Sequence, residues 1–262
     1  MTLGGVLVPL ATPLTERGEV STTCVAALIE SVRPYAAGLL PGLSTGEGWR
    51  LSKRQWTDML AATVEHARDL PVIAGVLLAD AAKIAERVWG VAERLHAVAV
   101  APPFDRSATQ DDIYAHFSVL RSATTTPIVI YNESQFSGAN MNVKTIRRVC
   151  ELGRVVGIKD SSGRIDVGRE LAATTGVPVF QGSEHLLADS TPLAGSVVGL
   201  ANLEPRLCAA AQTECSATTA DAVAHAVRRY GLDRDEWYAN VKRELVRRKV
   251  IRASTIVGGD RR

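Results

Sequence analysis

Eight short apolar runs recur between Gly5 and Leu200, and most of them are separated by stretches with a helical spacing of apolar residues. The runs are expected to form strands over Gly5–Pro9, Gly38–Leu43, Pro71–Val76, Ala97–Ala101, Pro127–Tyr131, Val155–Lys159, Val177–Gln181 and Gly195–Leu200. The intervening stretches are expected to form helices over Thr22–Arg33, Lys53–His66, Ala81–Arg94, Gln110–Ser122, Val143–Cys150 and Arg164–Thr174. Strands that alternate with helices are typical of βα units, and eight of them predict an α/β fold of the closed (β/α)8 TIM barrel type.

The chain after Pro205 carries helical patterns and no further strand signal. Helices are expected over Arg206–Cys215, Thr219–Tyr230 and Glu236–Val250, followed by a loose tail, STIVGGDRR. We therefore expect a barrel over residues 1–205 and a C-terminal helical appendage of the same domain over residues 206–262. The basic run VKRELVRRK, Val241–Lys249, is interpreted as a solvent-exposed helix face, since isolated charge runs are usually exposed.

Charge and hydropathy narrow the classes of partner. Thirty basic residues stand against twenty-eight acidic ones, a net charge of +2, which does not indicate nucleic-acid binding. The N-terminal segment lacks a basic region followed by a long apolar core, and no apolar run reaches the roughly eighteen residues of a membrane span. The sequence therefore predicts a soluble, cytoplasmic protein that acts on small molecules, without a membrane partner.

One lysine stands at the end of an apolar run, in the stretch VVGIKDSSG. An amine at the end of a buried strand loses hydration, which favours the neutral, nucleophilic form of Lys159. The alternative is a lysine whose stem lies along the strand while its charged head reaches water. The stretch alone leaves both interpretations open.

Polar residues follow three of the expected strands, where a barrel of this type places its reacting groups. Ser44 and Thr45 follow the second strand, Tyr131 ends the fifth and Lys159 ends the sixth. Together they offer a nucleophilic amine, a proton donor or acceptor and a tight turn that can bind a carboxylate. Among the five histidines, only His185 lies near this mouth.

Ordered motifs from Gly5 to Pro205 resemble the dihydrodipicolinate synthase and N-acetylneuraminate lyase family of Schiff-base class I aldolases. The motifs are PLATPLTERGEV, GLSTGEGWRLS, PVIAGV, APPFDRSATQDDIYAHF, PIVIYN, VVGIKDSSG, VFQGSE and GSVVGLANLEP. The resemblance implies that Lys159 forms an imine with pyruvate or a related 2-oxo acid, and that Tyr131 moves protons. It also implies that Ser44 and Thr45 bind the carboxylate of that acid, with Thr45 taking part in catalysis.

The resemblance has three further implications. Glu133, Phe136 and Val197 are expected to face the substrates, a 2-oxo acid and an aldehyde. The imine itself serves as electron sink, so neither a metal nor an organic cofactor is expected. Related proteins assemble, and a homodimer or homotetramer is expected here.

The sequence departs from the family pattern at two loops. Glu133 and Ser134 replace a Val-Pro pair, and Phe136 stands where synthases carry an arginine that binds a second carboxylate. This departure predicts a lyase or synthase for an aldehyde other than that of dihydrodipicolinate synthase. The segment Pro103-Phe104-Asp105 replaces a Pro-Tyr-Tyr segment whose second tyrosine completes a proton relay.

These departures leave two alternatives open. One is a dehydratase or hydratase that acts on the same imine with Glu133 or Asp105 as acid or base. The other is a catalytically silent barrel with a binding or regulatory role.

Overall fold

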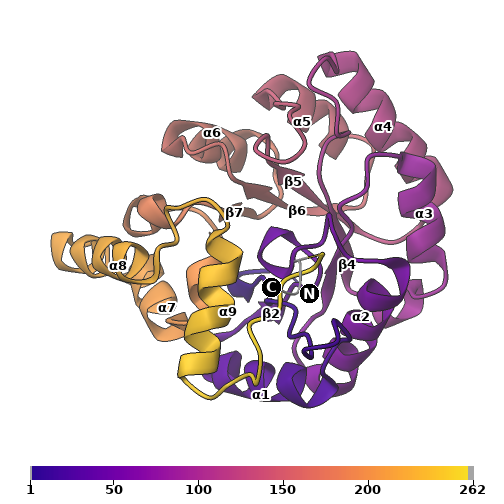
Figure 1. The fold of residues 1–262 in the computed structure, drawn as a ribbon. Helices are drawn as coiled ribbons and strands as arrows, with labels where there is room; N and C mark the ends of the chain where they lie inside the picture. The colour runs from indigo at the N-terminus through magenta and orange to yellow at the C-terminus, as the bar shows by residue number, and fades with distance from the viewer. Residues whose placement is uncertain (1, 259–262) are drawn as a thin grey trace.

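The computed structural model of the chain describes residues 2–258 and contains eight parallel strands around one barrel axis (Figure 1). Neighbouring strands follow the order β2-β1-β8-β7-β6-β5-β4-β3, and a parallel bridge between Leu39 and Val72 joins the two ends. The predicted (β/α)8 barrel is confirmed. The strands are β1 Gly5–Val8, β2 Gly38–Leu39, β3 Ile73–Gly75, β4 Ala97–Val100, β5 Ile128–Asn132, β6 Val155–Asp160, β7 Val179–Gln181 and β8 Gly195–Ser196.

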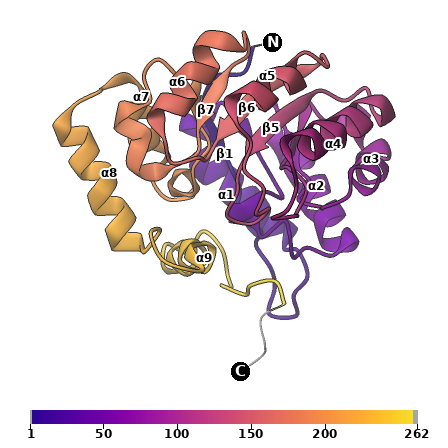
Figure 2. The same ribbon diagram turned by 90° about the horizontal axis from the view of Figure 1, so that it is seen from above.

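The helices are α1 Thr22–Val32, α2 Lys53–Ala67, α3 Ala81–Trp89, α4 Gln110–Ala123, α5 Val143–Cys150, α6 Ile165–Thr174, α7 Pro205–Thr213, α8 Ala217–Tyr230 and α9 Trp237–Arg247. Most of them cover the outside of the barrel, whereas α9 packs on the 3-10 turns Ser44–Gly46 and Gly199–Asn202 that follow β2 and β8 (Figures 1 and 2). The seventh unit has a six-residue 3-10 helix, Glu184–Asp189, and the C-terminal α8 packs against it. The appendage therefore contributes to the outer layer at this point.

Two apolar clusters hold these layers together. One lies inside the barrel and includes Leu7, Ile73, Val129 and Phe180, all buried. The other lies between the strands and the helices. Because both faces of the sheet are buried, the strands appear in the sequence as continuous apolar runs rather than as alternating patterns.

The expected strands Gly38–Leu43 and Gly195–Leu200 are too long. β2 ends at Leu39, and the chain then turns at Gly42, whose φ of 78° favours glycine. After β8 the chain forms a 3-10 helix, Gly199–Asn202, and the Asn202 amide donates to the carbonyl of Pro9 over 2.9 Å. Both departures bring loop residues over the barrel mouth.

The C-terminal segment departs from two expectations. Within the expected loose tail, residues 254–258 are described; Val257 is buried and its N–H donates a hydrogen bond to the Glu47 carboxylate, so this part packs against the fold. Residues 259–262 lie outside the described part. In the basic run, expected to be exposed, Lys242 is fully buried. The side chain finds a carboxylate partner inside the fold, which the local charge pattern does not reveal.

Within residues 2–258, no helix is both long and apolar enough to cross a membrane.

Candidate active site

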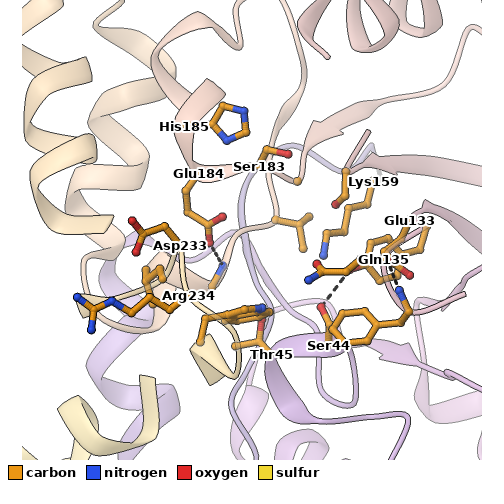
Figure 3. Close-up of a pocket in the computed structure, with 18 of the residues that line it drawn as sticks. Ser44, Thr45, Glu133, Gln135, Lys159, Ser183, Glu184, His185, Asp233 and Arg234 are labelled. Carbon is orange, nitrogen blue, oxygen red and sulfur yellow. Dashed lines mark hydrogen bonds between the residues drawn. The ribbon is translucent and has the colours of Figure 1, made fainter. Parts of the chain in front are cut away.

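A cavity of about 280 Å³ opens at the carboxyl-terminal end of the strands (Figure 3). All seven residues predicted for the site line it, namely Ser44, Thr45, Tyr131, Glu133, Phe136, Lys159 and Val197. Their strands and loops come from the second, fifth, sixth and eighth units of the barrel. The closed barrel is what brings these distant parts of the sequence to one place.

Lys159 lies near the end of β6, directly beside Tyr131 in the register between β5 and β6. Its side chain points into the cavity, and the ammonium nitrogen lies 3.9 Å from the centroid of the Tyr131 ring. Burial lowers the pKa of Lys159 to about 8, although the charges of Glu184 and Glu133 act in the opposite direction. About a tenth of the amine is then neutral at pH 7, against well under a thousandth for an ordinary lysine.

The Tyr131 hydroxyl forms a 3.0 Å hydrogen bond with the Ser44 hydroxyl. Burial raises the pKa of Tyr131 above its usual range, and the nearby Glu133 carboxylate acts in the same direction. The phenol is therefore neutral at physiological pH and can donate a proton to an oxygen in the cavity. The structure links Tyr131 to Ser44, whereas the sequence pointed to Thr45 as the catalytic hydroxyl.

The turn after β2 is a short 3-10 helix, Ser44–Gly46. The first N–H groups of such a helix have no partner within the helix, so those of Ser44 and Thr45 are available to an anion. The carbonyl of Gly46 accepts a 2.7 Å hydrogen bond from the buried Thr12 hydroxyl. A Cβ at position 46 would come within 2.8 Å of the Leu10 carbonyl oxygen, so glycine is required there.

In the loop after β5, the acidic side chain of Glu133 is held by hydrogen bonds from the backbone of the same loop. The Glu133 carboxylate accepts a 2.7 Å hydrogen bond from the backbone N–H of Phe136, and burial raises the pKa of Glu133. The Phe136 ring packs on Trp49, with 4.3 Å between ring centroids. Phe136 thus lines the cavity and also joins the loops after β2 and β5.

Asp105, one of the two proposed acid or base groups, does not line this cavity. Its side chain is exposed and accepts hydrogen bonds from the backbone and the hydroxyl of Ser107. The Asp105 carboxylate shapes its own loop through these hydrogen bonds, and it does not reach the cavity of its own chain.

Glu184 is a site residue that the sequence reasoning missed, although it stands in the motif VFQGSE after β7. Its carboxylate accepts a 2.9 Å hydrogen bond from the N–H of Gly199 and lies close enough to Lys159 to affect that amine. Burial raises the pKa of Glu184. The sequence signal for Glu184 was its position just after a strand. His185 has the same signal and also lines the cavity.

A second missed group comes from the loop between α8 and α9. Asp233, Arg234 and Asp235 of this loop line the cavity together with Trp237, the first residue of α9. The Arg234 guanidinium points away from Lys159 (Figure 3). No βα pattern could place this loop, because it lies outside the eight units. Among residues 2–258, no group of three or more His, Cys, Asp or Glu side chains could hold a metal ion.

Comparison with known proteins agrees with this geometry. The sequence model of the Dihydrodipicolinate synthetase family matches residues 2–229. A 4-hydroxy-tetrahydrodipicolinate synthase of Bartonella bacilliformis is 31% identical over 226 residues, which are 81% of this chain and 75% of the relative. Such relatives give no support to the expectation that this chain differs from the synthases in its aldehyde.

Solved structures share the fold. A prophage protein of the dihydrodipicolinic acid synthase family from E. coli K12, in complex with pyruvate, superposes with a TM-score of 0.90 at 17% identity, covering 99% of this chain and 93% of that one. The 2-keto 3-deoxygluconate aldolase from Picrophilus torridus superposes with a TM-score of 0.82 at 23% identity, covering 92% and 93%.

Proposed function

This chain belongs to the dihydrodipicolinate synthetase family of class I aldolase-type lyases, and from that premise we propose that it joins pyruvate, or a related 2-oxo acid, to an aldehyde through an imine on Lys159, or cleaves the corresponding adduct. The observation that carries the proposal is the buried amine of Lys159, whose pKa is lowered to about 8, beside a neutral tyrosine. The cavity supplies the nucleophile in its reactive form and a proton donor next to it.

The reaction begins when the neutral Lys159 amine adds to the keto carbon and its proton passes to the keto oxygen. A second proton, delivered from Tyr131, lets that oxygen leave as water and gives the protonated imine. The imine draws electrons from the neighbouring C–H bond, and the Tyr131 phenolate left by the previous step takes that proton, which gives an enamine. The enamine carbon attacks the aldehyde carbon, and the aldehyde oxygen takes the proton back from Tyr131. Water then hydrolyses the protonated imine, which restores the amine and returns the remaining proton to Tyr131.

The N–H groups of Ser44 and Thr45 bind the carboxylate of the 2-oxo acid. This turn and Tyr131 are joined by the hydrogen bond to Ser44, so the carboxylate and the keto oxygen are positioned by connected groups. Holding both ends of a small substrate reduces its freedom before reaction, which is a major source of rate enhancement.

The aldehyde is best suited to carry hydroxyl groups rather than a second carboxylate. Four carboxylates line the cavity, and among the lining residues within 2–258 the lysine and arginine side chains are Lys159 and an outward-pointing Arg234. Carboxylates accept hydrogen bonds from hydroxyls and repel another carboxylate. Phe136, packed on Trp49, supplies no cation at the β5 loop.

Dehydration of the same imine is less well supported, because Glu133 already accepts N–H groups of its own loop. A base that shapes its loop is less free to take a proton from substrate. Retention of the carbon skeleton with release of water would nevertheless identify a dehydratase, whereas an aldolase changes the number of carbons.

The test is incubation with pyruvate and sodium borohydride, followed by peptide mass spectrometry. We expect one reduced pyruvate adduct, on Lys159, and none in the Lys159→Met variant. Absence of an adduct with pyruvate and with other 2-oxo acids, in folded protein, would overturn the proposal and favour a silent barrel. Turnover is then compared for glyceraldehyde and for aspartate 4-semialdehyde, and faster turnover of the second would overturn the assignment of a hydroxyl-bearing aldehyde.

A further inference from the structure

A second lysine is buried away from the cavity, in an ion pair that the proposed chemistry does not use. Lys242 of α9 contacts the carboxylate of Glu47, and both side chains have an exposed fraction of 0%. Neither residue lines the cavity. A fully buried pair is costly to desolvate, and removal of one partner leaves an uncompensated charge, so such a pair ties its two segments firmly together.

The pair also holds the C-terminal segment. The Lys242 ammonium donates a 2.8 Å hydrogen bond to the carbonyl of Thr255, and the N–H of Val257 donates a 2.6 Å hydrogen bond to the Glu47 carboxylate. The buried ion pair thus joins Glu47, which is distant in sequence, to both α9 and the segment that contains Thr255 and Val257. We use the name C-terminal strap for α9 together with residues 250–257.

Glu47 directly follows the turn that the proposed function assigns to the 2-oxo acid carboxylate. Its N–H donates to the carbonyl of Ser44 over 3.0 Å, so Glu47 closes the last bond of that turn. It adopts a φ of 56°, a left-handed conformation that is unfavourable for glutamate. The side-chain bonds to Lys242 and Val257 can hold the residue in that conformation, and with it the Ser44 and Thr45 N–H groups.

The same helix contacts the active-site loops a second time. Tyr238, one turn before Lys242, lies edge-on to Trp49 with 5.4 Å between ring centroids, and Trp49 packs on Phe136. Trp237, at the start of α9, lines the cavity. The strap therefore reaches the loops after β2 and β5 through aromatic packing as well as through charge.

We propose that Lys242 is a positioning residue: through Glu47, the C-terminal strap fixes the Ser44–Thr45 turn in the geometry that binds the carboxylate of the 2-oxo acid. The proposal rests on the proposed function for its substrate, but the ordering of the turn is a property of the protein alone. Lys242 does not touch the substrate, and its effect is on binding of the 2-oxo acid rather than on the chemistry at Lys159.

The experiment compares wild-type protein with Lys242→Met, which removes the charge and keeps the length of the side chain. The matched control is Lys249→Met, the same change at an exposed position between α9 and residues 250–257. The Glu47→Gln variant provides a milder change, since glutamine can still accept the N–H of Val257, and it serves if Lys242→Met does not fold.

The first measurement is borohydride trapping across pyruvate concentrations. We expect the half-saturating pyruvate concentration to rise at least tenfold in Lys242→Met. The trapping rate at saturation should stay within about twofold of wild type, and the pH midpoint of trapping should stay within about a few tenths of a pH unit. The Lys249→Met control should match wild type. An unchanged half-saturating concentration in folded Lys242→Met protein would overturn the proposal.

The second measurement does not depend on any imine. Hydrogen exchange of the peptide that contains Ser44, Thr45 and Gly46 is expected to be faster in Lys242→Met and unchanged in Lys249→Met. If wild-type protein forms no adduct at all, the proposed function fails, and hydrogen exchange alone tests whether the C-terminal strap orders the turn. Equal exchange in Lys242→Met and wild type would then reject the positioning role of Lys242.

Discussion

Two lysines of this protein are almost fully withdrawn from water, yet they are surrounded differently. Lys159 faces the ring of Tyr131, with the carboxylates of Glu184 and Glu133 close enough only to moderate its pKa. Lys242 contacts the buried carboxylate of Glu47 directly. Burial lowers the pKa of both amines, but at Lys242 the paired carboxylate counters it.

The difference is the reason why the proposed function assigns chemistry to one buried lysine and not to the other. An unpaired buried amine is destabilised as an ammonium ion, and it becomes a nucleophile at neutral pH. A paired one keeps its charge and connects two segments. The position of the nearest carboxylate therefore separates the lysine assigned to chemistry from the lysine assigned to structure.

The largest expected effect is the loss of turnover on removing the reactive amine. The Lys159→Ala variant should lose at least about a thousandfold in kcat, because no other lysine stands among the described residues that line the cavity. The exposed Lys144→Ala variant is the control and should keep wild-type turnover. Steady-state kinetics on an identified aldehyde measures both, and retention of turnover in Lys159→Ala would reject the assigned roles of the two lysines.

The next effect is on stability. Lys242→Met leaves the Glu47 carboxylate buried without its partner, so the free energy of unfolding should fall by about 3–5 kcal/mol. The double variant Glu47→Gln/Lys242→Met carries no buried charge at this point and should recover part of the loss. Urea unfolding of the single and double variants measures the difference, and equal losses in both would show that the charge itself contributes little.

The sequence was sufficient for the fold and for much of the cavity, for a physical reason. Strand residues such as Val155 and Ile158 carry a local pattern, and parallel barrels place strand ends at one mouth, so Tyr131 and Lys159 follow from counting units. Lys242 and Trp237 could not be placed in this way. Their partners, Glu47 and Gly199, lie far away in the sequence, and only the packing of α9 across the barrel brings them together.

Replacement of Lys159 is expected to change the free energy of unfolding in the opposite direction to replacement of Lys242. Lys159→Met should raise the free energy of unfolding at pH 7, by up to about 3 kcal/mol, because the folded protein no longer buries an ammonium ion. Below pH 8 the lysine is protonated in both states and the full penalty applies. Between about pH 8 and 10.5 only the unfolded state keeps the proton, so wild-type stability rises toward that of the variant.

Unfolding of wild type and Lys159→Met across pH 7 to 10.5 measures this effect. We expect the advantage of the variant to shrink steadily as the pH rises through that window. An advantage that does not depend on pH would mean that methionine packs better, and that the amine is not held as an unfavourable ammonium ion.

The smallest effect concerns the charge that moderates the reactive lysine. Glu184 raises the pKa of Lys159 against the effect of burial, so Glu184→Gln should move the pH midpoint of borohydride trapping downward, by less than about one unit. Glutamine can still accept the N–H of Gly199, which preserves the loop. The matched change Glu47→Gln removes the carboxylate beside the other lysine and should leave this midpoint in place. If both variants shift the midpoint equally, the two lysines share one electrostatic environment, and the distinction between a reactive and a positioning lysine does not hold.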